Sequence, residues 1–97
     1  MIQKIEEYYP LRKQEVSWEE SDGQIVLLYL FKGEFFTLSP NVGVVWKFSD
    51  GKRSILEIIS KMGEILEGEQ NIVKEVFSSL DYLAENDLIE LFPLPLE

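Results

Sequence analysis

Residues 21–40 read SDGQIVLLYLFKGEFFTLSP, and this stretch decides the fold class of the 97-residue chain. Gln24 to Phe31 is apolar on both faces, which predicts a strand that is central in its sheet and covered on both sides. Asp22-Gly23 before it is a strong hairpin signal, because both residues can take a positive φ. Lys32-Gly33 after it predicts a second turn, and Glu34 to Leu38 predicts a third, short strand.

The residues before this stretch supply the first strand of the sheet. From Glu15 to Glu20, Val16 and Trp18 alternate with polar neighbours, which is typical of a strand with one buried face. The sequence therefore predicts a three-stranded antiparallel meander. Residues 1–10 are expected to form an N-terminal arm, and Pro10 disfavours a helix across its end because proline removes a backbone donor.

Helical signals begin where the strand signals end. Ser39 is a good N-cap and Pro40 suits the first helical position, so a helix is expected from Pro40 to Ser49, with Gly51 ending it. Its expected buried residues are Val42, Val45, Trp46 and Phe48.

Two more helices and a short strand complete the chain. Ser54 to Glu57 has the form of a capping box and starts a second helix, which Gly68 closes. Apolar residues at helical spacing predict a third helix from about Glu69 to Glu85. Leu88 to Phe92 predicts a final strand, and two prolines prevent regular structure in the tail, residues 92–97.

Size and composition indicate one globular domain over residues 1–97. Three strands, three helices and a short C-terminal strand predict an α+β fold of the winged helix-turn-helix type. The longest apolar run is strand-sized, and the N-terminus lacks the apolar stretch of a signal peptide. We therefore expect no membrane partner and a cytosolic location.

The residue types present argue against several classes of function. The chain has no cysteine and no histidine, so the usual residues of zinc sites and of nucleophilic triads are missing. We expect no enzyme activity, no catalytic residues, no cofactor and no metal site, and we interpret the acidic clusters as solvated faces. The net charge of −9 and the scattered lysines and arginines disfavour binding to nucleic acid.

The predicted third strand is a candidate binding site. In a simple meander it lies at the edge of the sheet, and Phe35 and Phe36 are adjacent, so one of them must point away from the helices. One interpretation is β-augmentation, in which an extended peptide pairs with Glu34 to Leu38. The other is that both phenylalanines are ordinary core residues and that the final strand covers the edge. Composition leaves both interpretations open.

The predicted third helix has a wide apolar arc that runs from Ile72 round to Phe77 and Ala84. Surplus apolar surface at the rim of this arc could form one wall of a groove, but a well-buried helix of a small domain gives the same pattern. The helix occupies the recognition position of a helix-turn-helix. It carries four carboxylates and one lysine, so its net negative charge would repel phosphates.

Read end to end, the sequence resembles the PqqD-like family, which includes the recognition elements that bind leader peptides in the biosynthesis of ribosomally made and post-translationally modified peptides. The family often has Leu-Asn where this chain has Leu38-Ser39, and small residues where it has Val44 and Val45. These differences concern the subfamily more than the fold. The matching segments are Ile25 to Gly33, Phe36 to Trp46, Asp50 to Ile55, Glu57 to Ile59, Phe77, Leu80, Leu83 and Asn86 to Glu90.

The resemblance implies that a leader peptide docks as an extra strand on the third strand and packs against the third helix. The chain would then hold a precursor and present it to a modifying enzyme, such as a radical SAM protein or a leader peptidase, in the biosynthesis of PQQ or of another modified peptide. The expected peptide-binding residues are Glu34, Phe35, Phe36, Thr37 and Leu38 on the strand, and Val73, Phe77, Leu80 and Asp81 on the helix.

Two alternatives of other classes remain. The same strand edge could pair with a second copy of the chain, which would make the protein a self-associating scaffold or a homodimer. A winged-helix transcriptional regulator is the third class, and its acidic helix disfavours it.

Overall fold

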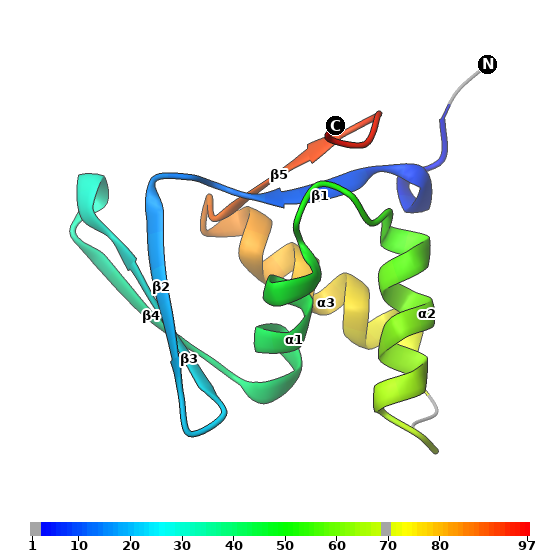
Figure 1. Cartoon of the computed structure of the whole chain (residues 1–97), viewed down its shortest axis with the longest axis horizontal. Helices are drawn as coiled ribbons and strands as arrows, with labels where there is room; N and C mark the ends of the chain where they lie inside the picture. The colour runs from blue at the N-terminus through cyan, green and yellow to red at the C-terminus, as the bar shows by residue number, and fades with distance from the viewer. Residues whose placement is uncertain (1–2, 69–70) are drawn as a thin grey trace.

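The computed structural model describes residues 3–68 and 71–97, in which two small sheets flank a group of three helices (Figure 1). No helix in these two ranges is long and apolar enough to cross a membrane. The elements in chain order are the 3₁₀ turn η1 (Ile5–Glu7), β1 (Tyr9–Arg12), β2 (Val16–Ser21), β3 (Gln24–Tyr29), the 3₁₀ turn η2 (Leu30–Lys32), β4 (Glu34–Leu38), α1 (Pro40–Phe48), α2 (Ile55–Ile65), α3 (Ile72–Glu85) and β5 (Ile89–Phe92).

The larger sheet is the predicted antiparallel meander, with strand order β2-β3-β4. The β2–β3 hairpin turns at Asp22 and Gly23, whose φ angles are 53° and 77°. Two successive positive φ angles match the right-handed twist of the flanking strands, which is why this dipeptide predicted the hairpin. The pairing register places Ile25 opposite Leu38, at the same end of the sheet as this turn.

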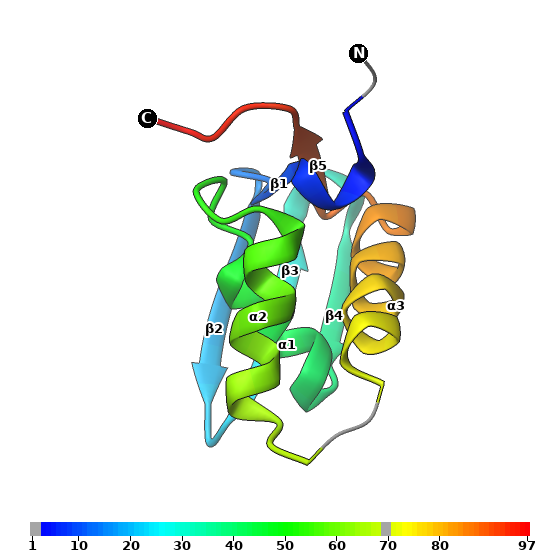
Figure 2. The ribbon, with the colours of Figure 1, turned by 90° about the vertical axis from the view of Figure 1, so that its right-hand side faces the viewer.

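The helices cover only one face of this sheet (Figure 2). Along β3, Ile25, Leu27 and Tyr29 are buried, whereas Val26 and Leu28 are only half-buried. The expectation that this strand is covered on both sides is therefore wrong. An apolar run can mark a strand that is central in pairing order although one of its faces remains open.

The apolar run also overstates the length of β3. The strand ends at Tyr29, and the next three residues form η2, in which Phe31 is 84% exposed. Gly33 closes this turn with a φ of 63°, so the chain reverses into β4 at the predicted place.

The three helices follow the predicted order and bury one shared core. Trp46 of α1 is fully buried, and Ser54 and Glu57 form both hydrogen bonds of the predicted capping box at the start of α2. The third helix begins at Ile72, and the predicted start at Glu69 lies outside the described residues. The remaining buried apolar residues are Val16, Ile25, Leu27, Tyr29, Leu38, Val45, Ile55, Ile58, Met62, Val76, Leu80, Leu83, Leu88 and Ile89.

The two ends of the chain pair with each other. β1 and β5 form a separate antiparallel sheet, with Tyr9 opposite Phe92 and Arg12 opposite Ile89 (Figure 1). Residues 3–10 of the expected arm therefore contribute a turn and the start of a strand. The predicted final strand exists, but its partner is β1 and not the larger sheet.

Gly51 is the position where the backbone has least freedom to accept a side chain. Its φ is +78°, and an added Cβ would lie 3.1 Å from Leu11 Cδ1 and 3.2 Å from Leu96 Cβ. Gly33 has a similar φ of +63°, with nothing within 4 Å of an added Cβ. Alanine substitutions at Gly51 and Gly33 therefore separate the cost of crowding from the cost of backbone strain.

We predict that Gly51→Ala lowers the free energy of unfolding by roughly 2–4 kcal/mol, from left-handed strain plus overpacking. Gly33→Ala should cost only the strain, about 1–2 kcal/mol. Urea unfolding of both variants, followed by circular dichroism, checks this. Equal losses in the two variants would show that the contacts with Leu11 and Leu96 do not constrain this turn.

Candidate functional site

The edge of β4 is unpaired. β4 pairs with β3 alone, and no backbone hydrogen bond joins Glu34–Leu38 to any other element within residues 3–68 and 71–97. The interpretation in which the final strand covers this edge is wrong, because β5 pairs with β1. An unpaired edge presents N–H and C=O groups that a further strand can use.

The hairpin register indicates which way each backbone group points. Ser21 and Gln24 flank the two-residue turn, so they form a hydrogen-bonded pair across β2 and β3. Successive residues of β3 then direct their N–H and C=O groups alternately to β2 and to β4. Ile25, the next residue, therefore bonds to its partner Leu38 in β4.

The same alternation continues along β4. Its even-numbered residues direct their backbone groups to β3, whereas Phe35 and Thr37 direct theirs to the free edge. Side chains alternate as well. Phe36 lies on the helix side and is half-buried against the core, while the Phe35 side chain is 66% exposed on the opposite face.

β2 forms the other edge of the sheet, and it differs chemically from β4. Its outer half carries Glu19 and Glu20, and Glu20 forms an ion pair with Lys47 of α1 at 3.1 Å. Charged side chains on an edge strand oppose the addition of another strand. β4 has one charged residue, Glu34, at its start. The β4 edge is therefore the better template for pairing.

A groove of about 270 Å³ lies between β4, the start of α1 and α3. This is smaller than the roughly 300–1,000 Å³ of pockets that enclose drug-sized ligands, so it fits individual side chains better than a whole small molecule. Its lining residues are Thr37, Ser39, Val42, Glu75, Ser78, Ser79 and Tyr82.

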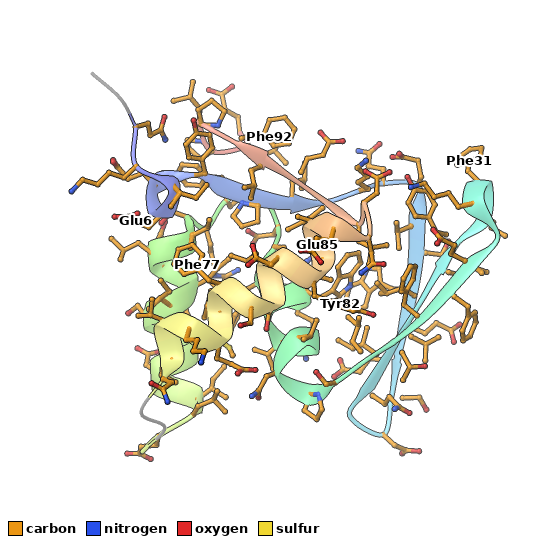
Figure 3. All side chains as sticks on the ribbon, turned by 180° about the vertical axis from the view of Figure 1, so that it is seen from behind. Glu6, Phe31, Phe77, Tyr82, Glu85 and Phe92 are labelled. Atoms are coloured by element: carbon orange, nitrogen blue, oxygen red, sulfur yellow. The ribbon has the colours of Figure 1, made fainter. Side chains whose placement is uncertain are left out.

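The groove uses a different face of α3 from the one expected. Leu80 is 5% exposed and belongs to the core, while Phe77 is half-buried on the opposite flank of the helix from Tyr82. In Figure 3, Phe77 lies toward α2 and η1, whereas Tyr82 lies toward the three-stranded sheet. Val73 and Asp81 are exposed and do not line the groove.

The five expected strand residues lie in different surroundings. Thr37 lines the groove, and Phe36 lies on the helix side of the strand. Leu38 is 3% exposed, so its side chain is part of the core and only its backbone belongs to the strand edge. Glu34 is exposed at the start of β4. The structure thus brings Thr37 to the groove, packs Phe36 against the core and leaves Phe35 outside the groove.

A second hollow, of about 330 Å³, lies on the open face of the larger sheet. Phe35 belongs to this hollow, together with the outward-facing residues of β3. The full lining is Ser17, Trp18, Glu19, Val26, Leu28 and Phe35. It is lined from the face of the sheet, so a ligand there would contact side chains and would not add a strand to the sheet.

The α3 residues of the groove have a sequence signal of their own. Glu75, Ser78, Ser79 and Tyr82 are spaced i, i+3, i+4 and i+7, which places them on one side of a helix. Apolar periodicity does not reveal this stripe, because its residues are mostly polar. Its position beside the buried stripe of Val76 and Leu83 becomes meaningful only once β4 is known to lie next to it.

The two clustered basic residues of the chain have structural roles. The Arg12 guanidinium lies 5.3 Å from the centre of the Trp18 ring and donates to the backbone oxygens of Trp46, at 3.0 Å, and of Lys47, at 2.7 Å. Its pKa is lowered by burial. Lys13 pairs with Asp87. Neither charge is free to contact a phosphate backbone.

Asp87 holds the start of β4 close to the end of α3. Its carboxylate pairs with Lys13 and, at 2.9 Å, with Lys32 of η2, the residue two before β4 begins. Hydrogen bonds from Lys13 and then Lys32 lower the pKa of Asp87 from 3.8 to about 2. Asp87 has a φ of 61°, a conformation that aspartate and asparagine accept more readily than most residues.

A solved structure described as TbiB1 in complex with the TbiA(beta) leader peptide superimposes on this chain with a TM-score of 0.72. The match covers 82% of this chain and 94% of the other, at 24% sequence identity. The two proteins share a fold. The predicted α+β architecture of a three-stranded sheet, three helices and a short C-terminal strand is confirmed. The sequence matches no family model and no curated protein.

We predict that stability falls between pH 4 and pH 2 more in the wild type than in Asp87→Asn. The folded-state pKa of Asp87 lies below its ordinary value, so its contribution is complete above pH 3.8 and is lost as pH falls through about 2. Asparagine accepts the same backbone conformation but does not titrate. Thermal unfolding of both proteins across this range is the measurement, and parallel curves would contradict the prediction.

Proposed function

We propose that this protein binds the leader segment of a ribosomally made precursor peptide by β-augmentation at β4. The observation that carries the proposal is the unpaired edge of Glu34–Leu38 with a side-chain-sized groove directly beside it. Backbone pairing along an edge supplies affinity for any extended peptide, and a groove next to the edge adds selectivity for particular side chains.

A docked peptide strand would pair with Phe35 and Thr37, whose backbone groups face the free edge. Its side chains would alternate between the open face of the sheet and the groove. We assign the helix contacts to Glu75, Ser78 and Tyr82, which line the groove, in place of the expected Val73, Phe77, Leu80 and Asp81. The rim of the groove on the strand side is Thr37, with Phe36 next to it.

The fold likeness supports the same function. TbiB1, with which this chain shares its fold, was solved in complex with a leader peptide. A leader bound to β4 would leave the attached core peptide free to reach a modifying enzyme, such as a radical SAM protein or a leader peptidase. This chain would act as a non-catalytic peptide chaperone in the biosynthesis of PQQ or of another modified peptide.

Self-association through the β4 edge is the second candidate, and the same unpaired backbone favours it. Charge opposes it, because each copy carries a net charge of −9 and Glu34 begins the pairing strand. A regulator that binds DNA is disfavoured further by the structural engagement of Arg12 and Lys13. We expect no shift of duplex DNA at low salt, and sedimentation of a monomer at micromolar concentration.

We predict that Thr37→Pro weakens leader binding roughly tenfold, because proline removes one free-edge donor and leaves a peptide carbonyl unpaired. Proline is tolerated on an edge strand where its nitrogen faces solvent, so the β3 ladder should survive. Thr37→Val is the matched control, because it removes the hydroxyl and keeps the backbone donor. The probe is a synthetic leader from a precursor gene adjacent to that of this chain, titrated into ¹⁵N-labelled protein.

In the wild type, shifts should concentrate on Glu34–Leu38 and on the groove face of α3. Thr37→Val should bind within about threefold of the wild type, since only a side-chain contact is lost. Shifts centred on the open face of the sheet, around Val26 and Leu28, would reject β-augmentation at β4 and point to the second hollow.

A further inference from the structure

The chemistry of the β4–α3 groove indicates which side chain it accepts. Hydroxyl groups from both sides dominate its lining, and Val42 contributes an apolar residue. Glu75 is the only charged residue among the lining residues. An apolar leader side chain placed there would remove water from a carboxylate without providing a partner, which is unfavourable.

The Glu75 carboxylate is held in place on one side only. Asn41 Nδ2 donates to Glu75 Oε1 at 3.1 Å, which orients the carboxylate from the start of α1. Oε2 makes no hydrogen bond and no ion pair among the described residues. Glu75 is half-buried, so its charge is less screened than that of a fully exposed surface carboxylate.

The surroundings favour a cation at this oxygen. Lys74 is the neighbouring residue, but it is exposed and points about 100° away around the helix. None of the ion pairs within residues 3–68 and 71–97 involves Glu75. The net charge of −9 adds a general attraction for basic peptides.

A long basic side chain also fits the shape of the groove. The aliphatic stem of lysine or arginine can lie against Val42 while its charged end reaches the carboxylate. Tyr82 is two helical turns from Glu75, about 10 Å along the axis. Successive inward side chains of a docked strand are about 7 Å apart. Glu75 and Tyr82 therefore meet different residues of the peptide.

We propose that Glu75 selects a lysine or arginine at one inward-facing position of the peptide strand docked on β4. The inference rests on the proposed function and adds the class of residue that the groove reads. Tyr82 then meets the next inward-facing residue, for which its half-exposed ring favours an apolar or aromatic side chain. Glu75 acts as a specificity residue, while the backbone of β4 supplies affinity that does not depend on sequence.

The test is an unbiased selection of random twelve-residue peptides displayed on phage, carried out against the wild type, Glu75→Gln and Glu85→Gln. Glutamine at position 75 keeps the acceptor for Asn41, so the fold and the carboxamide position should be preserved. Glu85 lies on the same helix, is exposed and does not line the groove (Figure 3). Its replacement removes the same charge without changing the groove.

The wild type and Glu85→Gln should enrich peptides with lysine or arginine at one fixed position, and Glu75→Gln should lose that preference. Replacing the selected basic residue by methionine should weaken binding to the wild type roughly tenfold, the scale of a charge-assisted hydrogen bond, and should hardly affect binding to Glu75→Gln. A double-mutant cycle between residue 75 and the peptide position measures this coupling.

The contrary outcomes separate the two proposals. Selected peptides without a basic position, or the same preference in Glu75→Gln, would overturn the role of Glu75 and leave peptide binding at β4 standing. If no peptide were enriched by any of the three proteins, and a leader from an adjacent precursor gene also failed to bind, both proposals would fail. If Glu85→Gln lost the basic preference to the same extent, the preference would come from general electrostatic attraction and not from a local contact with Glu75.

Discussion

The pairing of β1 with β5 is the constraint on which the rest of the molecule depends. It joins the two ends of the chain above the helices, and β1 also bonds to the α1–α2 connection, with Gly51 N–H donating to Pro10 O at 2.8 Å and Arg12 N–H to Ser49 O at 2.9 Å (Figure 1). A final strand used in this way cannot cover the larger sheet. β4 is consequently left as an edge, next to a helix whose groove-facing stripe is polar.

An unpaired edge invites association between identical chains unless something opposes it. Here β4 is five residues long and begins with Glu34, and every copy of the protein is strongly acidic. The negative charge makes copies of the chain repel each other but does not oppose a peptide that is neutral or basic. Charge therefore disfavours pairing between two copies of the chain and still permits pairing with a peptide, although both use the same backbone groups of β4.

The features that were predictable from sequence are local. The hairpin depends on the positive φ angles of two adjacent residues, Asp22 and Gly23. The start of α2 depends on the reciprocal bonds between Ser54 and Glu57, which lie within four adjacent residues. The partner of β5 was not predictable, because it pairs residues about 80 positions apart and no local pattern distinguishes β1 from β4 as that partner. Apolar periodicity located the core stripe of α3, but the groove uses the polar stripe beside it, which contains Glu75.

Amide hydrogen exchange along β4, with and without a bound leader peptide, tests the central claim most directly. The even-numbered residues already bond to β3, whereas the N–H groups of Phe35 and Thr37 face the free edge. We expect the peptide to slow exchange at Phe35 and Thr37 and to change Phe36 little. Uniform slowing over the whole strand, or slowing confined to β2, would contradict pairing of the peptide with β4.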